Sequence, residues 1–162
     1  MQSLVPVPKV LAVSSGGGHW AELLRLRPAF EGADVVYVVT QAAYRGDLAR
    51  GGRGTRRVKG FMTVPDANKD QKLLLLLLAL KMAFVVIRVR PDVVLSTGAA
   101  PGYFAIRFGK WLGARTVWVD SIANAEDISA AGMLVRPHAD LWLSQWPGLS
   151  ERSGAVYAGA VM

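Results

Sequence analysis

The sequence contains no cysteine and only two histidines, His19 and His138, among its 162 residues. Without thiols the chain cannot form disulfide bonds or thiolate zinc sites, and two histidines are too few for a histidine-rich metal site. We therefore expect no bound metal. The first nine residues lack the basic start and long apolar core of a signal peptide, so we expect a cytoplasmic protein.

Acidic residues are also scarce, with 12 against 19 lysines and arginines and a net charge of +7. Such a balance favours an anionic partner: nucleic acid, an anionic membrane surface or a phosphorylated substrate. The segment Tyr44–Lys59 predicts a mobile basic loop, which either stays solvated or contacts phosphate or lipid headgroups. No aromatic side chains separate its arginines, so a stacking surface for nucleic acid is not supported and we expect none to bind. The basic residues of this loop are Arg45, Arg50, Arg53, Arg56, Arg57 and Lys59.

Short apolar runs alternate with longer helical stretches along the chain. Because the runs are apolar throughout, they predict strands that are covered on both faces, as in a parallel sheet. The alternation indicates an α/β fold with one Rossmann-like, doubly wound, mainly parallel sheet, in a single domain over 1–162. Strands are expected at Val10–Val13, Val35–Thr40, Val93–Ser96, Thr116–Val119, Leu141–Ser144 and Ala155–Tyr157, and helices at His19–Phe30, Lys72–Val89, Gly102–Leu112 and Glu126–Arg136.

Two glycine-rich turns each follow an apolar strand. The first, Ser14-Ser15-Gly16-Gly17-Gly18-His19, leads into a helix, and its free N–H groups suit phosphate or another anion. The second runs from Ser96 to Gly102. Both lie at the carboxyl edge of the predicted sheet, where open α/β folds bind ligands. The pair predicts a cleft that handles a phosphorylated molecule.

His19 stands at the mouth of this cleft, where a side chain with a pKa near neutrality can take a proton. The alternative is a structural histidine that caps the helix or bonds a backbone carbonyl. His138 lies on a helix-to-strand connection, and we expect it to be structural. Asp120 ends a strand at the same edge and either orients a hydroxyl group or caps the next turn. Glu126 and Asp127 are expected to favour the dipole of the helix that they begin.

The run Gly16-Gly17-Gly18-His19-Trp20-Ala21 also fits the loose dinucleotide pattern. A nicotinamide enzyme would need an acidic residue at the end of the second strand, which here ends Val39-Thr40-Gln41. An oxidoreductase is therefore the weaker alternative. No phosphate-binding loop of the nucleoside triphosphatase type is present.

Six consecutive leucines open an apolar segment, Leu73–Ile87, within an expected helix over 73–89. At about 1.5 Å per residue the segment spans about 22 Å, short of the ~30 Å hydrocarbon core of a membrane. Its apolar residues surround nearly the whole helix, which predicts a contact with a bilayer interface or a partner in addition to the sheet. A plain core helix is the alternative. The residues expected at a membrane are Leu74, Leu75, Leu77, Leu78, Lys81 and Arg88.

Several motifs together resemble the acceptor-side, membrane-anchoring subunit of two-part glycosyltransferases. They are Ser14–His19 with Glu22-Leu23-Leu24-Arg25-Leu26, then Arg90–Gly98, Asp120-Ser121, Ala139–Trp146 and Val156–Gly159. The family includes the bacterial PssD-type exopolysaccharide proteins and the anchoring subunit of the eukaryotic enzyme that adds the second N-acetylglucosamine to dolichol-linked sugar. The first half of MurG is similar at a greater distance.

The resemblance implies the N-terminal half of a GT-B fold, active with a separate donor-binding subunit and without a cofactor. The pair would transfer a hexosyl, N-acetylhexosaminyl or glucuronosyl group from a UDP-sugar to a polyprenyl-diphosphate-linked acceptor, at the cytoplasmic face of the membrane. By position, His19 would be the general base. Eukaryotic members begin with a transmembrane anchor, so here membrane attachment would rest on Leu73–Ile87 and the basic loop. The acceptor and its diphosphate would contact Ser15, Gly16, Gly17, Gly18, Ser96, Thr97, Gly98 and Asp120.

A GT-B active site lies between two domains, so one sheet domain offers half a cleft. The apolar, glycine-containing segment Gly148–Met162 is the expected docking element for the other half. The rival interpretation is a non-catalytic module that recruits a catalytic partner to the membrane.

Overall fold

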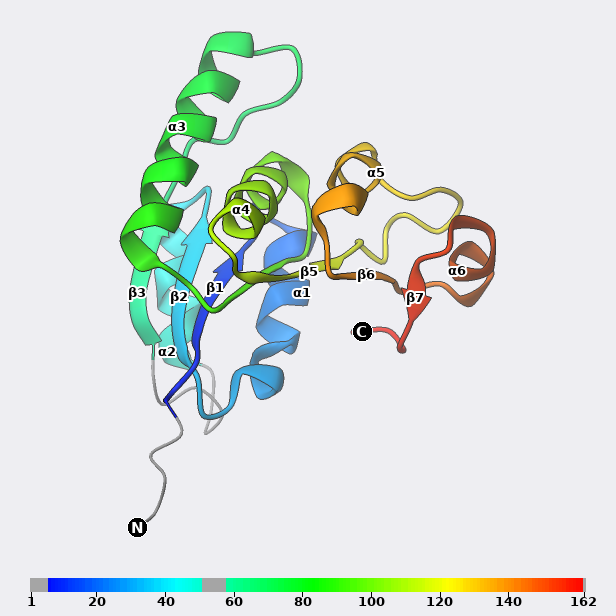
Figure 1. Cartoon of the computed structure of the whole chain (residues 1–162), viewed down its shortest axis with the longest axis horizontal. Coiled ribbons are helices and arrows are strands. Elements are labelled where there is room, and N and C mark those ends of the chain that lie inside the picture. The colour runs from blue at the N-terminus through cyan, green and yellow to red at the C-terminus, as the bar shows by residue number, and fades with distance from the viewer. Residues whose placement is uncertain (1–5, 51–57, 162) are drawn as a thin grey trace.

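Seven parallel strands form one sheet in the computed structural model, which describes residues 6–50 and 58–161 (Figure 1). Their order across the sheet is β3-β2-β1-β4-β5-β6-β7. The predicted α/β fold with a parallel sheet is confirmed. The strands are β1 (Lys9–Val13), β2 (Asp34–Val39), β3 (Val58–Thr63), β4 (Val93–Ser96), β5 (Arg115–Val119), β6 (Leu141–Ser144) and β7 (Val156–Tyr157).

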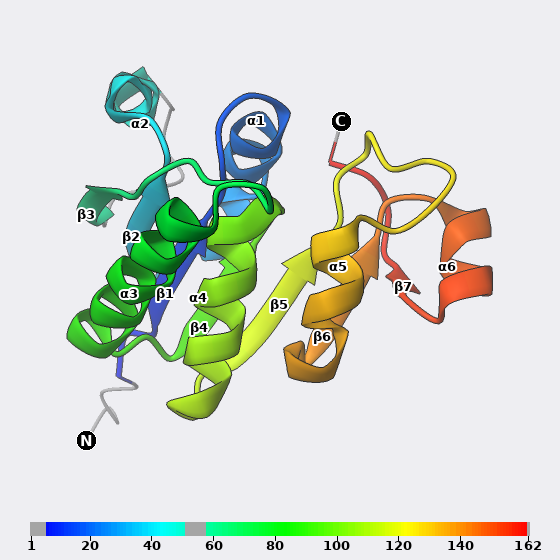
Figure 2. The same cartoon turned by 90° about the horizontal axis from the view of Figure 1, so that it is seen from above.

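The helices cover both faces of this sheet. Seen from above, α3, α4 and α5 lie along one face, and α1 and α2 lie on the other (Figure 2). The α-helices are α1 (Gly18–Arg25), α2 (Arg45–Arg50), α3 (Lys72–Val89), α4 (Ala99–Trp111), α5 (Ala130–Val135) and α6 (Pro147–Ser153).

Strand β1 shows why the strands are apolar throughout. Leu11 and Val13 belong to the core beneath α3 and α4, whereas Val10 and Ala12 belong to the core beneath α1. Since successive side chains of a strand point to opposite faces, a strand between two helix layers needs apolar residues at every position.

The chain direction across the sheet reverses between β1 and β4. From β1 the chain moves outward to β2 and β3, and it then returns through α3 to place β4 on the other side of β1. Helix α1 leaves β1 toward one face and α4 leaves β4 toward the other (Figure 2). This is the topological switch point at which open α/β sheets form a ligand crevice, and both glycine turns lie there.

Several predicted bounds are correct and others are wrong. Helix α3 and strands β4 and β6 have the predicted bounds. The helix predicted to reach Phe30 ends at Arg25, and a 3-10 turn follows because Pro28 cannot continue an α-helix. The helix predicted from Glu126 begins at Ala130, so Glu126 and Asp127 lie in the preceding loop rather than in a first helical turn.

Three elements were not predicted from the sequence: α2, β3 and α6. Helix α2 and the start of β3 occupy both ends of the segment that we expected to be a mobile basic loop. Its middle, residues 51–57, lies outside the described residues, as does Met162. Helix α6 lies within the segment expected to dock a partner, beside the short edge strand β7.

Candidate functional site

The two glycine turns are joined by reciprocal hydrogen bonds at the switch point. The ring nitrogen Nδ1 of His19 lies 2.8 Å from the carbonyl oxygen of Thr97. In return the Thr97 hydroxyl donates to the carbonyl oxygen of His19 at 2.7 Å. The start of α1 is thereby fixed to the turn that follows β4.

This contact defines the tautomer of His19. A carbonyl oxygen only accepts, so Nδ1 of the neutral ring carries the hydrogen and Nε2 keeps its lone pair. No protein group bonds Nε2 within the described residues, and the side chain is half-buried. Nε2 is therefore the ring nitrogen that can accept a proton, and the bond from Nδ1 to a backbone carbonyl is also the contact expected of a structural histidine.

Gly98 lies directly against the His19 ring. A Cβ atom at this position would come within 2.4 Å of His19 Cε1, and the backbone φ of 141° also favours glycine. The neighbouring residues Ser96 and Thr97 are fully buried. Ser96 accepts a hydrogen bond from the Gly98 N–H at 3.1 Å, so these predicted site residues hold the turn in shape from below.

The first glycine turn leaves the start of α1 open. Gly17 caps the helix at φ 65°, and Cβ atoms added at Gly17 or Gly18 would meet nothing within 4 Å. The first N–H groups of a helix have no partner within it, and they carry partial positive charge. Gly17 and Gly18 are exposed at this end of α1, whereas Gly16 lies close to Tyr44 and Gln41 and Ser15 is buried.

Tyr44 completes this turn, although no motif marked it in the sequence. Its hydroxyl accepts a hydrogen bond from the Gly17 N–H at 2.9 Å, and its ring lies 5.4 Å from that of Trp20. The only available signal was its place shortly after β2, which neighbours β1 in the sheet.

Asp120 reaches the expected edge but points inward. It is 1% exposed, and its carboxylate accepts hydrogen bonds from the Trp118 indole, the Asn124 amide, and both the backbone N–H and hydroxyl of Ser129. With both oxygens occupied, the geometry supports the expectation that Asp120 caps the following turn. It offers no free oxygen to a ligand.

Glu22 is a second buried carboxylate at this edge that had no role assigned from sequence. It lies one turn after His19 on α1, is 5% exposed, and bonds Ser121, Ile122 and Gln145. His138 is far from this group, in a 3-10 turn before β6, where its carbonyl oxygen accepts from Thr116 at 2.6 Å. That contact is made by the backbone, so the structural role of the His138 side chain stays a prediction.

Helix α3 is apolar on two opposite faces. One packs on the sheet and includes Leu78 and Met82, both fully buried. The opposite face, here called the outer α3 face, carries apolar side chains that are 45–86% exposed. Its members are Leu73, Leu76, Leu77, Leu80, Phe84 and Ile87.

Of the residues expected at a membrane, Leu77, Lys81 and Arg88 are exposed on α3. Leu74 and Leu75 are partly buried against the core. Including Leu78 was wrong, because its side chain is 0% exposed in the core between α3 and the sheet. Within the described residues, no helix combines the length and the apolar character needed to cross a membrane.

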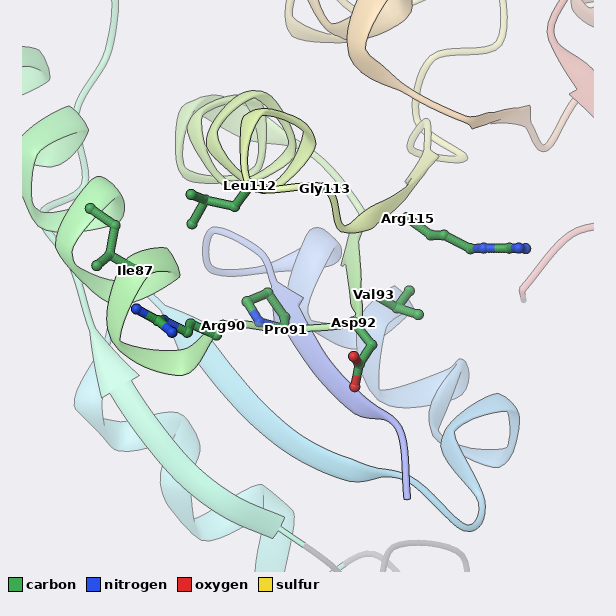
Figure 3. Close-up of a pocket in the computed structure, with 8 residues that line it drawn as sticks. All are labelled: Ile87, Arg90, Pro91, Asp92, Val93, Leu112, Gly113 and Arg115. Atoms are coloured by element: carbon green, nitrogen blue, oxygen red, sulfur yellow. The ribbon is translucent and has the colours of Figure 1, made fainter. Parts of the chain in front are cut away.

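A pocket of about 730 Å³ lies at the amino edge of the sheet, opposite the glycine turns (Figure 3). Eight residues line it, among them Arg90, Asp92 and Arg115. The Arg90 and Arg115 side chains point away from each other, so they do not converge on one anion. Over residues 6–50 and 58–161, no group of three or more His, Asp or Glu side chains could hold a metal ion.

Comparison with known proteins gives matches along nearly the whole chain. The family described as "Oligosaccharide biosynthesis protein Alg14 like" matches residues 70–161. The UDP-N-acetylglucosamine transferase subunit ALG14 of Eremothecium gossypii is 26% identical over 91% of this chain and 76% of its own length. The protein of the same name from Yarrowia lipolytica is 25% identical over 90% of this chain and 76% of its own length.

Solved structures show the same fold at low sequence identity. MurG of Acinetobacter baumannii superposes with a TM-score of 0.68 at 12% identity, over 88% of this chain and 42% of its own. The UDP-N-acetylglucosamine 2-epimerase of Rickettsia bellii superposes with a TM-score of 0.70 at 16% identity, over 97% of this chain and 46% of its own. The chain thus spans less than half the length of these structures and resembles one half of a GT-B fold. Since the family match covers more than half of its residues, the chain belongs to the Alg14-like family of oligosaccharide biosynthesis proteins.

Proposed function

We propose that this chain is the acceptor-side subunit of a glycosyltransferase, which moves a sugar from a UDP-sugar to a polyprenyl-diphosphate-linked acceptor. Family membership supports a role in oligosaccharide biosynthesis, and the fungal relatives are named as transferase subunits. The observation that carries the proposal is the free Nε2 of His19, oriented beside an open helix N-terminus at the switch point.

The chemistry follows from these two features. Nε2 of His19 takes the proton of the acceptor hydroxyl as its oxygen attacks the anomeric carbon of the sugar. The bond between that carbon and UDP breaks, and UDP leaves as an anion stabilised by the donor-binding partner. The positive end of α1 favours the diphosphate of the acceptor at Gly16–Gly18.

The test uses the complex purified with its donor-binding partner, UDP-N-acetylglucosamine and a short-chain polyprenyl-diphosphate-linked sugar. We expect His19→Ala to lower kcat by roughly 10²-fold or more, because a positioned base contributes about that factor. His138→Ala is the matched control and should keep wild-type turnover. If the folded His19→Ala protein keeps its turnover, His19 is not the general base. If the wild-type complex is inactive, the proposed transferase function is wrong.

We also propose that the outer α3 face rests on an anionic membrane at its cytoplasmic side. Its six large apolar side chains lie beside the exposed Lys81 and Arg88, a combination that suits the boundary between headgroups and acyl chains. Each basic residue near an anionic surface adds about 1 kcal/mol of attraction. This arrangement would bring the acceptor lipid to the same subunit that holds its reactive hydroxyl.

Vesicle sedimentation tests this surface. Replacing Leu76, Leu80 and Phe84 together by serine should abolish binding to vesicles containing phosphatidylserine. The matched control replaces Met133 and Leu134, two exposed apolar residues of α5, by serine. This variant should bind the vesicles as the wild-type protein does. Equal binding of the two variants would show that α3 does not contact the bilayer.

The non-catalytic alternative is a membrane recruiter for a catalytic partner. The outer α3 face supports recruitment under either interpretation, so it does not separate them. The His19→Ala measurement does, since a recruiter predicts normal turnover together with normal vesicle binding.

A further inference from the structure

The two buried acidic side chains of the carboxyl edge support the same loop. Glu22 is 5% and Asp120 is 1% exposed, and both bond the irregular segment 121–129 between β5 and α5. Asp120 holds its middle and far end through Asn124 and Ser129. Glu22 holds its beginning, and it does so from a different element, helix α1.

Glu22 accepts three hydrogen bonds. Its Oε1 accepts from the Ser121 hydroxyl at 2.7 Å and from the Ile122 N–H at 3.2 Å. Its Oε2 accepts from the Gln145 amide at 3.2 Å. These donors follow β5 and β6, so the carboxylate connects α1 to the far half of the sheet beyond β4.

Gln145 extends the same network. Its amide nitrogen also donates to the Asp120 carbonyl at 3.0 Å, and its amide oxygen accepts from the Val161 N–H at 2.9 Å. The orientation of this amide is therefore fixed by groups on both sides. Gln145 cannot turn over to offer an oxygen to position 22 without breaking both bonds.

Desolvation makes this arrangement costly, because a carboxylate loses water on burial and none of its three donors is charged. An apolar side chain at position 22 would avoid that cost but would leave the donors of Ser121, Ile122 and Gln145 without this acceptor. The carboxylate instead fixes the orientation of α1 along the sheet, because it accepts hydrogen bonds from three donors in two loops.

We propose, on the basis of the proposed function, that Glu22 is a positioning residue for His19. His19 is the second residue of α1 and Glu22 lies one turn later in the same helix. The turn after β4 holds the imidazole through Thr97, and Glu22 holds the helix against the loops after β5 and β6. Together these contacts fix Nε2 relative to segment 121–129, the rim that an acceptor at this edge would meet.

The substitution Glu22→Gln tests the proposal with little change of shape. An amide at position 22 places an NH₂ group against either the Gln145 amide or the Ile122 N–H, so at least one bond is lost. In the complex with its partner we expect kcat to fall about tenfold, since small misplacements of a catalytic group cost factors of this order or more. The KM for UDP-sugar should stay unchanged. Glu31→Gln, an exposed position after α1, is the matched control and should match wild type in both.

A double-mutant cycle with His19→Ala separates positioning from general support of the fold. If Glu22 acts through His19, Glu22→Gln should have less than about a twofold effect in the His19→Ala background. An equal loss in both backgrounds, or no loss in either, would overturn the proposal. If Glu22→Gln does not fold, Ser121→Ala replaces it in the cycle, because it removes one donor and keeps the carboxylate. Its loss of kcat should be smaller and should vanish in the His19→Ala background.

Imidazole NMR of the isolated chain provides a readout that needs no turnover. In Glu22→Gln we expect the Nδ1–H signal of His19 to shift and exchange faster, because its bond to Thr97 loosens. Unchanged His19 signals would overturn the positioning role. If the wild-type complex transfers no sugar, the proposed function fails by that result, and the NMR comparison still decides the role of Glu22.

Discussion

The imidazole of His19 fills the space that a side chain at position 98 would need, so Gly98→Ala tests the site directly. A methyl group there would lie 2.4 Å from the imidazole, at a backbone φ of 141°. We expect a loss of about 1–3 kcal/mol of stability and at least about a tenfold loss of transferase activity. Denaturant unfolding and the assay with the partner measure the two effects.

Gly46→Ala is the control for this prediction. Gly46 lies in α2 with open space around it and no positive φ, so alanine there should be neutral or stabilise the fold by up to about 1 kcal/mol. If Gly98→Ala behaves like Gly46→Ala, the imidazole does not depend on the close approach of Gly98.

Asp140 predicts a small dependence of stability on pH. Its hydrogen bond with Lys110 is the main reason that its pKa lies below the usual value, with further help from Thr116 and some opposition from burial. A lowered pKa in the folded state stabilises the fold above the unfolded-state pKa, and this is lost as the pH falls through the folded-state pKa.

Asp140→Asn should therefore cost less than about 1 kcal/mol at pH 7, because the pair is exposed and solvent screens it. The difference from wild type should disappear as the pH falls well below about 4, where Asp140 also becomes neutral. Urea unfolding at pH 7, 5 and 3 checks this. Asp66→Asn, at an exposed position, is the control, and a gap that widens toward low pH would contradict the sign.

At the residue scale, the sequence predicted the motifs made of contiguous residues but not the contacts between residues far apart in the chain. The glycine turns and His19 are contiguous, so their order of strand, turn and helix could be read directly. Glu22 bonds Gln145 across 123 positions, and Tyr44 bonds Gly17 across 27. No spacing rule links such residues. Asp120 was placed at the correct edge, but whether its carboxylate faces inward depends on Asn124 and Ser129.

At the element scale, the sequence of α3 predicts where the helix forms but not which of its faces is buried. Its bounds could be predicted because good helix formers run from Lys72 to Ala83 and no Gly or Pro interrupts the segment up to Val89. Its buried face could not, since leucines point in every direction and the hydrophobic periodicity is weak. Packing on the sheet selects Leu78 and leaves Leu80 62% exposed.

Leu78→Ala and Leu80→Ala should therefore differ, although both remove the same atoms from neighbouring positions of one helix. The first leaves a cavity in the core and should cost about 2–5 kcal/mol of unfolding free energy. The second removes an exposed side chain and should stay within about 0.5 kcal/mol. Chemical denaturation of the two variants measures this, and equal costs would contradict the orientation of α3.

The elements that the sequence analysis missed have physical reasons in common. Strand β3 lies at the edge of the sheet, is half exposed and contains Lys59 and Gly60, so it lacks an apolar run. Helix α6 begins at Pro147, which punctuates a sequence but is also favoured in the first turn of a helix. Short elements with polar or glycine residues depend on neighbours that only the folded sheet provides.

At the scale of the whole molecule, the parallel direction of the strands separates a carboxyl edge of the sheet from an amino edge. The carboxyl edge holds the glycine turns, His19 and the loop 121–129. The amino edge holds the pocket beside Arg90 and Arg115 (Figure 3). The strand order could be anticipated only as a class, because a doubly wound sheet fixes the edge at which ligands bind but not which strands are neighbours.

If a donor-binding subunit closes the site, its contact should lie at the carboxyl edge. Hydrogen exchange of the chain, alone and in the purified complex, should then show slower exchange at residues 16–18, 98–100 and 121–126. Residues 90–93 and 112–115 at the amino edge should exchange at the same rate in both states and serve as the internal control. Protection confined to the amino edge would place the partner across the sheet from His19. A base that far from the donor sugar could not take part in the transfer, whatever the family of the chain.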